Sequence, residues 1–183
     1  VDGVSREVPR PFIVMATQNP KGSAGTQLLP ESQLDRFMIC MSMGYPDVKS
    51  EIAIARGRSS SANMVELQPV IGAQELEALC GMVEDVYMSE SIYTYIVALV
   101  GKTRENSYIE LGVSPRGTIA LLRMAKAMAV IDGRDYVCAK DVQDVARDVL
   151  GHRVKLSARG KAQGITMQQA IGMVIANVTA PRV

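Results

Sequence analysis

The chain has 183 residues, of which 48% are hydrophobic and 21% charged, and its formal net charge is +1. These values are ordinary for a globular protein of one or two domains, and they give no general electrostatic attraction to nucleic acid or to an anionic membrane. Aromatic residues make up only 4% of the chain and tryptophan is absent, which disfavours a surface that stacks nucleic-acid bases.

The three cysteines, Cys40, Cys80 and Cys138, are far apart and form no Cys-x-x-Cys pair. This pattern predicts a reducing compartment and no zinc site. No apolar run reaches the roughly 18 residues that a membrane span needs, and no segment is typical of a signal peptide. We therefore expect a cytoplasmic protein without a bound metal.

The N-terminal part predicts two buried strands around one short helix. Residues 12–16 (FIVMA) form a continuous apolar run with β-branched members, which is typical of a strand buried on both faces. Pro30 is expected to open a helix that ends near Arg36. Residues 37–43 (FMICMSM) form the second apolar run.

From residue 47 onward the pattern becomes helical. Asp47 is expected to cap a helix that runs to residue 55, and residues 73–86 predict another helix with an apolar face. Ser89 is expected to cap the next helix. The residues expected on the buried side of that helix recur at helical spacing, namely Ile92, Tyr93, Ile96, Leu99 and Val100.

Residues 105–113 are expected to form a loop before the longest helix. Ser114 and Pro115 suit the N-cap and first position of that helix, and Gly133 suits its end. Two further helices follow. One contains Val142, Val145, Val149 and Leu150, and the other begins at the capping box of Thr166 and Gln169.

Asn19 follows the first predicted strand. Ligands of open α/β sheets bind beyond the carboxyl ends of the strands, where an amide can hold a nucleophilic water in line with a terminal phosphate. The alternative, which the local sequence alone favours, is that Thr17, Gln18 and Asn19 only form a turn.

Arg36 follows Asp35 near the end of the predicted short helix. One interpretation is an arginine finger that stabilises transition-state charge on a phosphate, expected to be held by a neighbouring subunit. The alternative is a surface ion pair with Asp35 or Glu31, which is common and contributes little. Taken alone, the residue favours the ion pair.

Arg116 lies in the first turn of the longest predicted helix. A cation there opposes the helix dipole by about 0.3–1 kcal/mol, whereas it reinforces the attraction of that helix end for an anion. Because the penalty is small, Arg116 is equally compatible with two interpretations: it binds an anion outside the helix, or the helix simply tolerates a cation at this position.

The remaining cations indicate no site of their own. His152 has no second histidine or cysteine nearby, and we expect a structural role at a helix end where its positive charge is favourable. Arg123, Lys126 and Arg134 are expected to form a solvated face. The short basic run that begins at His152 and Arg153 contains no aromatic residue, so nucleic-acid binding through it is not expected.

Four stretches together resemble the MoxR family of AAA+ ATPases. PFIVMATQNP is similar to that family's sensor 1 strand, and GTQLLPESQLDRF to its arginine-finger helix. GYPDVKSEI is similar to the exit into the lid, and SPRGTIALLRMAKAMAVIDGRDYV to the sensor 2 helix. The resemblance extends over essentially the whole chain. It implies that Asn19 is sensor 1, Arg36 the arginine finger and Arg116 the sensor 2 arginine that binds nucleotide.

The resemblance implies a mainly α fold, in which a helical-bundle lid domain follows a small two-strand, one-helix remnant of the α/β AAA+ core. We expect the partial core at residues 1–46, a connecting helix and linker at 47–68, and the lid at 69–183. Without the P-loop strand that separates them in the family, the two strands are expected to pair with each other or a second copy, or to pack on the lid.

The sequence contains no GxxxxGK[ST] motif and no acidic strand end before residue 12. We therefore interpret the chain as the C-terminal fragment of a larger ATPase. The resemblance implies ATP and Mg²⁺ as cofactors of the intact protein, chaperone-like remodelling of partner proteins, and assembly into a ring, expected to be a hexamer. The fragment alone is expected neither to bind ATP tightly nor to hydrolyse it. The alternative is a non-catalytic helical adaptor that binds a protein partner or nucleic acid.

Overall fold

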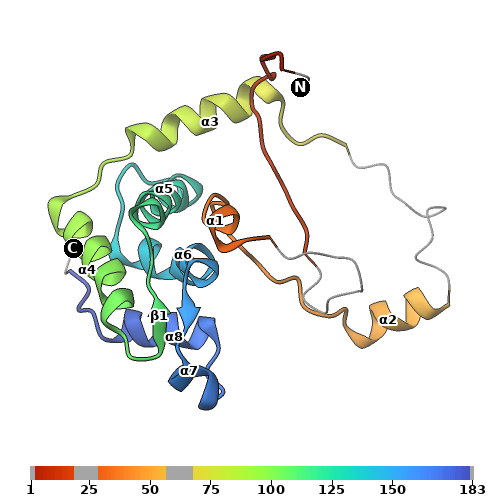
Figure 1. The fold of residues 1–183 in the computed structure, drawn as a ribbon. Coiled ribbons are helices and arrows are strands. Elements are labelled where there is room, and N and C mark those ends of the chain that lie inside the picture. Colours follow the sequence, from red (N-terminus) through yellow and green to blue (C-terminus); the bar gives the residue numbers. More distant parts are fainter. Residues whose placement is uncertain (1–2, 19–28, 57–67, 182–183) are drawn as a thin grey trace.

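The computed structural model describes residues 3–18, 29–56 and 68–181, which form a mainly helical structure (Figure 1). Its helices are α1 (Glu31–Leu34), α2 (Val48–Ala55), α3 (Ala73–Asp85), α4 (Glu90–Glu105), α5 (Pro115–Ile131), α6 (Ala139–Leu150), α7 (Ala158–Ala162) and α8 (Met167–Ala176). A 3₁₀ turn, η2 (Gly151–Arg153), follows α6, and the strands are β1 (Ile109–Leu111) and β2 (Lys155–Leu156). None of the described helices is long and apolar enough to cross a membrane.

Capping signals in the sequence predicted several helix ends correctly. The Asp47 carboxylate accepts a 2.7 Å hydrogen bond from the backbone N–H of Ser50 at the start of α2. Thr166 and Gln169 form the predicted reciprocal capping box at the start of α8. Gly133 follows the end of α5 with a φ of 71°, a conformation that glycine adopts without strain.

The hydrophobic core lies between α4, α5, α6 and α8 (Figure 1). Its fully buried side chains include Leu99, Leu121, Val142 and Ile171, one from each of these helices. The apolar residues of α6 recur at helical spacing and face this core, as the sequence predicted. The four helices therefore form the stable body of the molecule.

The buried face of α4 differs from the prediction at one residue. Tyr95 is 3% exposed, whereas Tyr93 is 38% exposed. The reason is helical spacing, since Tyr95 lies three residues after Ile92 and four before Leu99, on the same face. The Tyr95 hydroxyl accepts a 3.0 Å hydrogen bond from Gln143 on α6.

The segment before α5 is not only a loop, so that prediction was incomplete. Residues 109–111 form β1, which pairs antiparallel with β2, Ile109 opposite Leu156. The partner strand lies more than 40 residues later in the chain, and a pairing of such short segments leaves no local signal. This small sheet packs beside α4 and α7.

The two strands predicted in the N-terminal part are not formed. Residues 12–18 and 37–46 are irregular, and their apolar side chains are largely exposed, with Phe12 at 65% and Met43 at 99%. A strand needs hydrogen-bonding partners, and neither segment pairs with the other. The second segment instead contacts the lid, because the Cys40 N–H donates a 2.9 Å hydrogen bond to the Asp148 carbonyl. Packing on the lid is thus the outcome for residues 37–40.

Helix α3 forms as predicted, but its apolar face is only partly covered. Leu79 is 41% exposed, and no residue of the helix is buried. The helix reaches from the bundle toward the N-terminal segment (Figure 1). Lys126 of α5 joins the C-terminal end of α3 to the bundle by donating a 2.8 Å hydrogen bond to the Glu84 carbonyl.

Arg134 is not part of a solvated face, which corrects the prediction for that residue. Its guanidinium hydrogen-bonds both carboxylate oxygens of Asp141, whose side chain is 3% exposed, and also reaches Asp132 at 2.9 Å. These bonds raise the pKa of Arg134. Burial opposes ionisation of Asp141, but its bonds to Arg134 and to the Cys138 amide lower the pKa below its usual range. The cluster joins the end of α5 to the start of α6.

Replacing Arg134 tests this cluster. We expect Arg134→Met to lower the free energy of unfolding by about 2 kcal/mol, because a buried carboxylate loses its charged partner. Urea denaturation measures the change. Arg123→Met is the matched control, since Arg123 is exposed on α5 and makes no ion pair in the described part of the chain. Equal effects of the two substitutions would contradict the role of Arg134.

Candidate functional site

Arg36 lies just beyond α1 and its side chain is exposed. Its backbone N–H donates to the Gln33 carbonyl at 3.1 Å. The local ion pair that the sequence left open is not formed among the described residues. Asp35 pairs with Arg153 and Glu31 lies 4.0 Å from Lys155. The guanidinium of Arg36 is therefore not committed to a partner in the described chain.

Arg116 is also exposed, at the second position of α5. Within residues 3–18, 29–56 and 68–181, it makes no ion pair or side-chain hydrogen bond. It is near enough to Arg153 that its charge contributes to lowering the pKa of that residue. The first turn of α5 thus presents an uncompensated cation at the positive end of a long helix.

Asp35 connects the segment of Arg36 to the helix of Arg116. Its carboxylate accepts hydrogen bonds from the Ser114 hydroxyl, at 3.0 and 3.3 Å to the two oxygens. Arg153 Nε donates to the same carboxylate at 3.1 Å. Ser114 was expected to cap α5, and it does occupy the N-cap position, but its side chain makes no bond to the helix. It binds Asp35 instead.

Arg153 is the buried centre of this cluster. Its side chain is 2% exposed, and its guanidinium donates to the carbonyl oxygens of Asp35, Phe37 and Met38, and to that of Val149. Burial lowers the pKa of Arg153, while Asp35 opposes that shift. Because arginine ordinarily titrates far above neutrality, the guanidinium remains charged.

Sequence reasoning missed Arg153 and Asp35. Arg153 was interpreted only as a member of a short basic run, and Asp35 as a local partner for Arg36. The two residues that pair are separated by 118 positions. The one available signal was that Arg153 comes three residues after a helix ending in the buried Val149 and Leu150, which places it at the edge of the core.

His152 is structural, as predicted, but its charged form is not favoured. Burial lowers the pKa of His152, and the neighbouring Arg153 charge adds to this effect. His152 Nε2 lies 3.0 Å from the Phe37 carbonyl and 2.8 Å from Arg153 Nη1; a protonated Nε2 donates to the carbonyl, whereas an unprotonated Nε2 accepts from Arg153. In both tautomers the imidazole lies against Arg153 and the segment that follows Arg36.

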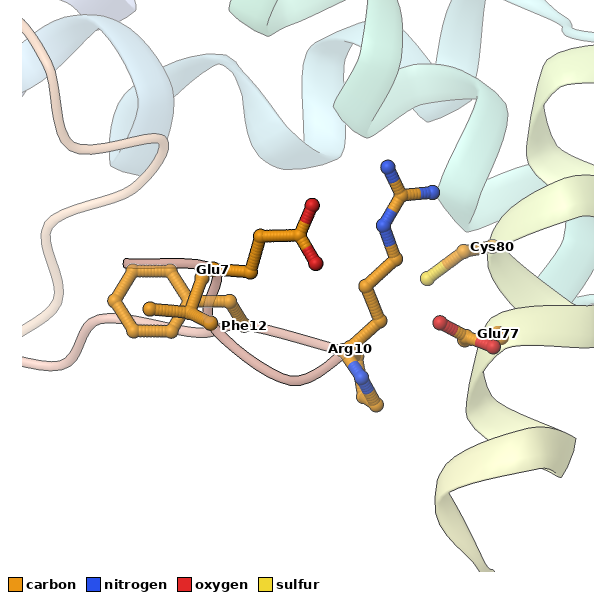
Figure 2. Close-up of a pocket in the computed structure, with 7 residues that line it drawn as sticks. Glu7, Arg10, Phe12, Glu77 and Cys80 are labelled. Atoms are coloured by element: carbon orange, nitrogen blue, oxygen red, sulfur yellow. The ribbon is translucent and has the colours of Figure 1, made fainter. Parts of the chain in front are cut away.

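Asn19 lies outside the described residues, so its predicted role stays a prediction. A shallow hollow elsewhere lies between residues 7–12 and α3, where Arg10 and Glu7 face Glu77 and Cys80 (Figure 2). It shares no residue with the cluster around Arg153. The described residues contain no group of three or more His, Cys, Asp or Glu side chains that would suit a metal ion.

Comparisons with known proteins match two regions of the chain, which contain Arg153 and Asp35 respectively, to two models of AAA proteins. Residues 101–171 match the AAA lid domain, and residues 1–39 match the ATPase family associated with various cellular activities (AAA). The chain is 40% identical over 181 residues to the uncharacterized protein YeaC of Bacillus subtilis. The aligned region spans 99% of this chain and 57% of that relative. It is 31% identical over 192 residues to the chaperone MoxR1 of Mycobacterium tuberculosis, and this alignment spans 100% of this chain and 50% of MoxR1.

A solved structure agrees with these relatives. A protein of Cytophaga hutchinsonii, provisionally described as an ATPase, superposes with a TM-score of 0.83 at 37% identity, over 95% of this chain and 56% of that one. The chain belongs to the MoxR family of AAA+ proteins. It spans about half the length of the relatives that it matches. A mainly helical fold with an AAA lid domain is thus confirmed, and a non-catalytic adaptor is not favoured.

Two exposed side chains and one helix end among the described residues suit an anion. Arg36 and Arg116 offer two exposed, unpaired guanidiniums, which suit phosphate oxygens. The backbone N–H of Arg116 also has no acceptor among the described residues, and this helix end attracts anions. The sequence contains no P-loop to hold a phosphate chain or its Mg²⁺.

The buried imidazole predicts a pH dependence of stability. The pKa of His152 is lower in the folded chain than the usual value of about 6.5 in the unfolded chain. Its contribution is therefore complete above about pH 6.5 and is lost as the pH falls toward the folded pKa. We expect the free energy of unfolding to decrease from pH 7.5 to pH 5, and the decrease to be smaller in His152→Gln, whose amide retains a donor.

The sequence contains a single histidine, so its NMR titration is unambiguous. We expect one imidazole curve with a midpoint below 6.5 in the folded chain and near 6.5 in urea. Facing groups have opposite effects, since Arg153 disfavours the charged ring whereas Asp35 and the carbonyls of Phe37 and Asp148 favour it. A folded midpoint at or above that of the unfolded chain would show that burial does not dominate.

Proposed function

We propose that this chain is the sensor and lid part of a MoxR-type AAA+ ATPase, with residues 1–46 contributing to its core and residues 69–183 forming its lid. In the intact ATPase, Arg36 acts on ATP bound by a neighbouring subunit, Arg116 binds the γ-phosphate in its own subunit, and Asn19 positions the attacking water. ATP and Mg²⁺ are the cofactors of that larger protein.

One observation carries the proposal. Arg36 follows Asp35 in the chain and Arg116 lies two residues after Ser114; both arginines are exposed, and the charge of Asp35 is already committed to Arg153 and Ser114. An unpaired arginine in the first turn of a helix is unfavourable for the helix itself. An external anion removes that penalty, and a terminal phosphate is the anion that an AAA+ protein binds.

The partner class follows from the relatives. MoxR1 is described as a chaperone, and we propose a chaperone-like role in the cytoplasm, in which a ring of subunits, expected to be six, remodels partner proteins. An arginine that acts on a neighbour's ATP requires a head-to-tail interface, and such interfaces close into rings. Nucleic acid is not expected as a partner, because the net charge of the chain is only +1.

Mixing of variant subunits tests the two arginines. In the longer ATPase that carries this chain, we expect Arg36→Ala to lower kcat by about 10³-fold and Arg116→Ala by at least about tenfold. Equimolar mixing of the two impaired variants should raise the activity above the mean of the separate variants, since about one ring interface in four then carries both arginines. Arg123→Ala is the control and should hydrolyse ATP normally. Unchanged rates in both single variants, or mixing that never restores activity, would contradict the proposed roles.

The chain by itself gives a second test. We expect the 183-residue chain to release no phosphate from ATP above the rate without protein, because it has no P-loop to hold the nucleotide. A phosphate-release assay with Mg²⁺ and ATP measures this directly. If the 183-residue chain hydrolysed ATP and Arg116→Ala abolished that activity, the proposal that residues outside this chain bind the phosphates would be wrong.

A further inference from the structure

We propose that Arg153, Asp35 and Ser114 form a clamp that positions Arg36 on the lid, which makes Arg153 a positioning residue for ATP hydrolysis on the neighbouring subunit. This inference rests on the proposed function, because it assigns a task to residues that do not themselves touch the nucleotide. The name clamp is used below for these three residues.

The clamp binds the backbone on both sides of Arg36. Arg153 Nη2 donates to the Asp35 carbonyl at 3.2 Å and also to the Phe37 carbonyl, and Nη1 donates to the Met38 carbonyl at 3.1 Å. Arg36 lies between these bonded groups. Its backbone is therefore fixed, while its side chain remains exposed and unpaired among the described residues.

The clamp also contacts the start of α5. The Ser114 hydroxyl donates to Asp35, and Gly117 leaves room for the stem of Arg153. A Cβ atom on Gly117 would lie 2.9 Å from Arg153 Cδ and 2.3 Å from Val113 Cγ1, which is closer than real contacts allow. The turn that carries Arg116 thus packs directly on the side chain that holds the segment of Arg36.

The two arginines depend on the clamp to different extents. Helix α5 is also held by core residues such as Leu121 and Ala125, both 0% exposed. The segment after Arg36 has no comparable packing, since Met38, Ile39 and Met41 are all exposed. Outside the clamp, the described residues show two further polar contacts of this segment with the lid: the Phe37 carbonyl lies 3.0 Å from His152 Nε2, and the Cys40 N–H donates to the Asp148 carbonyl. Loss of Arg153 should therefore release Arg36 and leave Arg116 in place.

Arg153→Lys is the informative substitution because it keeps the charge. A lysine ammonium has three donors at one point and cannot span Asp35 and three separate carbonyls as the planar guanidinium does. In the longer ATPase we expect kcat to fall at least tenfold with KM for ATP changed less than threefold. The matched control, Arg123→Lys on the exposed face of α5, should leave both constants unchanged.

Subunit mixing then separates positioning from general stability. Arg153→Lys subunits should regain activity when mixed with Arg116→Ala subunits but not when mixed with Arg36→Ala subunits. The double variant Arg36→Ala/Arg153→Lys should be no slower than Arg36→Ala alone. If the Arg36→Ala and Arg116→Ala subunits restore each other but Arg153→Lys is additive with Arg36→Ala, the clamp is wrong and the proposed function stands. If those two fail to restore each other, the proposed function itself fails.

Hydrogen exchange on the 183-residue chain gives a readout that does not depend on activity. In Arg153→Lys and in Asp35→Asn, we expect the Cys40 amide to exchange at least tenfold faster, while amides of α4 and α6 keep their protection. Asp135→Asn is the control, since Asp135 is exposed and its side chain makes no bond in the described chain. Unchanged exchange at Cys40, or a uniform loss of protection over the whole bundle, would overturn the clamp.

Discussion

The structure depends on how one buried guanidinium is satisfied. Arginine carries five N–H donors and a permanent charge, so its burial is tolerated only where acceptors converge on it. Arg153 is the last residue of η2, where its local partners are the Val149 carbonyl and the Nε2 atom of His152. The other acceptors, Asp35 and the carbonyls that follow it, come from a segment more than 110 residues earlier. The hydrogen bonds that satisfy the Arg153 guanidinium therefore join the N-terminal part to the lid.

The junction between the N-terminal part and the lid is made of hydrogen bonds and an ion pair, whereas the bundle is held by apolar packing. The interior of the bundle is apolar and almost fully buried, so α4, α5, α6 and α8 are held by the hydrophobic effect. The N-terminal segments carry apolar side chains that this chain does not cover, as at Phe12 and Met15. The N-terminal part is therefore joined to the bundle mainly by hydrogen bonds and not by buried apolar surface.

The sequence predicted those features that short-range chemistry determines. The caps at Asp47 and Thr166 and the stop at Gly133 follow from hydrogen bonds and backbone angles within a few residues, and all three were correct. The predicted strand at residues 12–16 was wrong because an apolar, β-branched run indicates only what a segment does when a partner strand is present. Arg153 was missed for the same reason, since its partner is distant and nothing at either position marks the pairing. Arg36 and Arg116 were singled out mainly by the resemblance to the MoxR family, since the local sequence alone favoured an ion pair for Arg36 and left Arg116 open; their roles stay predictions.

Ser114 shows how a local prediction can be correct in place and wrong in role. It occupies the N-cap of α5, with extended backbone, yet its hydroxyl donates to Asp35 and accepts no hydrogen bond from the helix amides. The first turn of α5 consequently keeps an amide without an acceptor among the described residues, beside the exposed Arg116. Both groups favour an anion at that point. A serine oxygen that accepted a hydrogen bond from this amide would weaken the attraction for an anion. Here the hydroxyl leaves the amide free and donates to Asp35, which helps to hold the segment of Arg36 beside the helix.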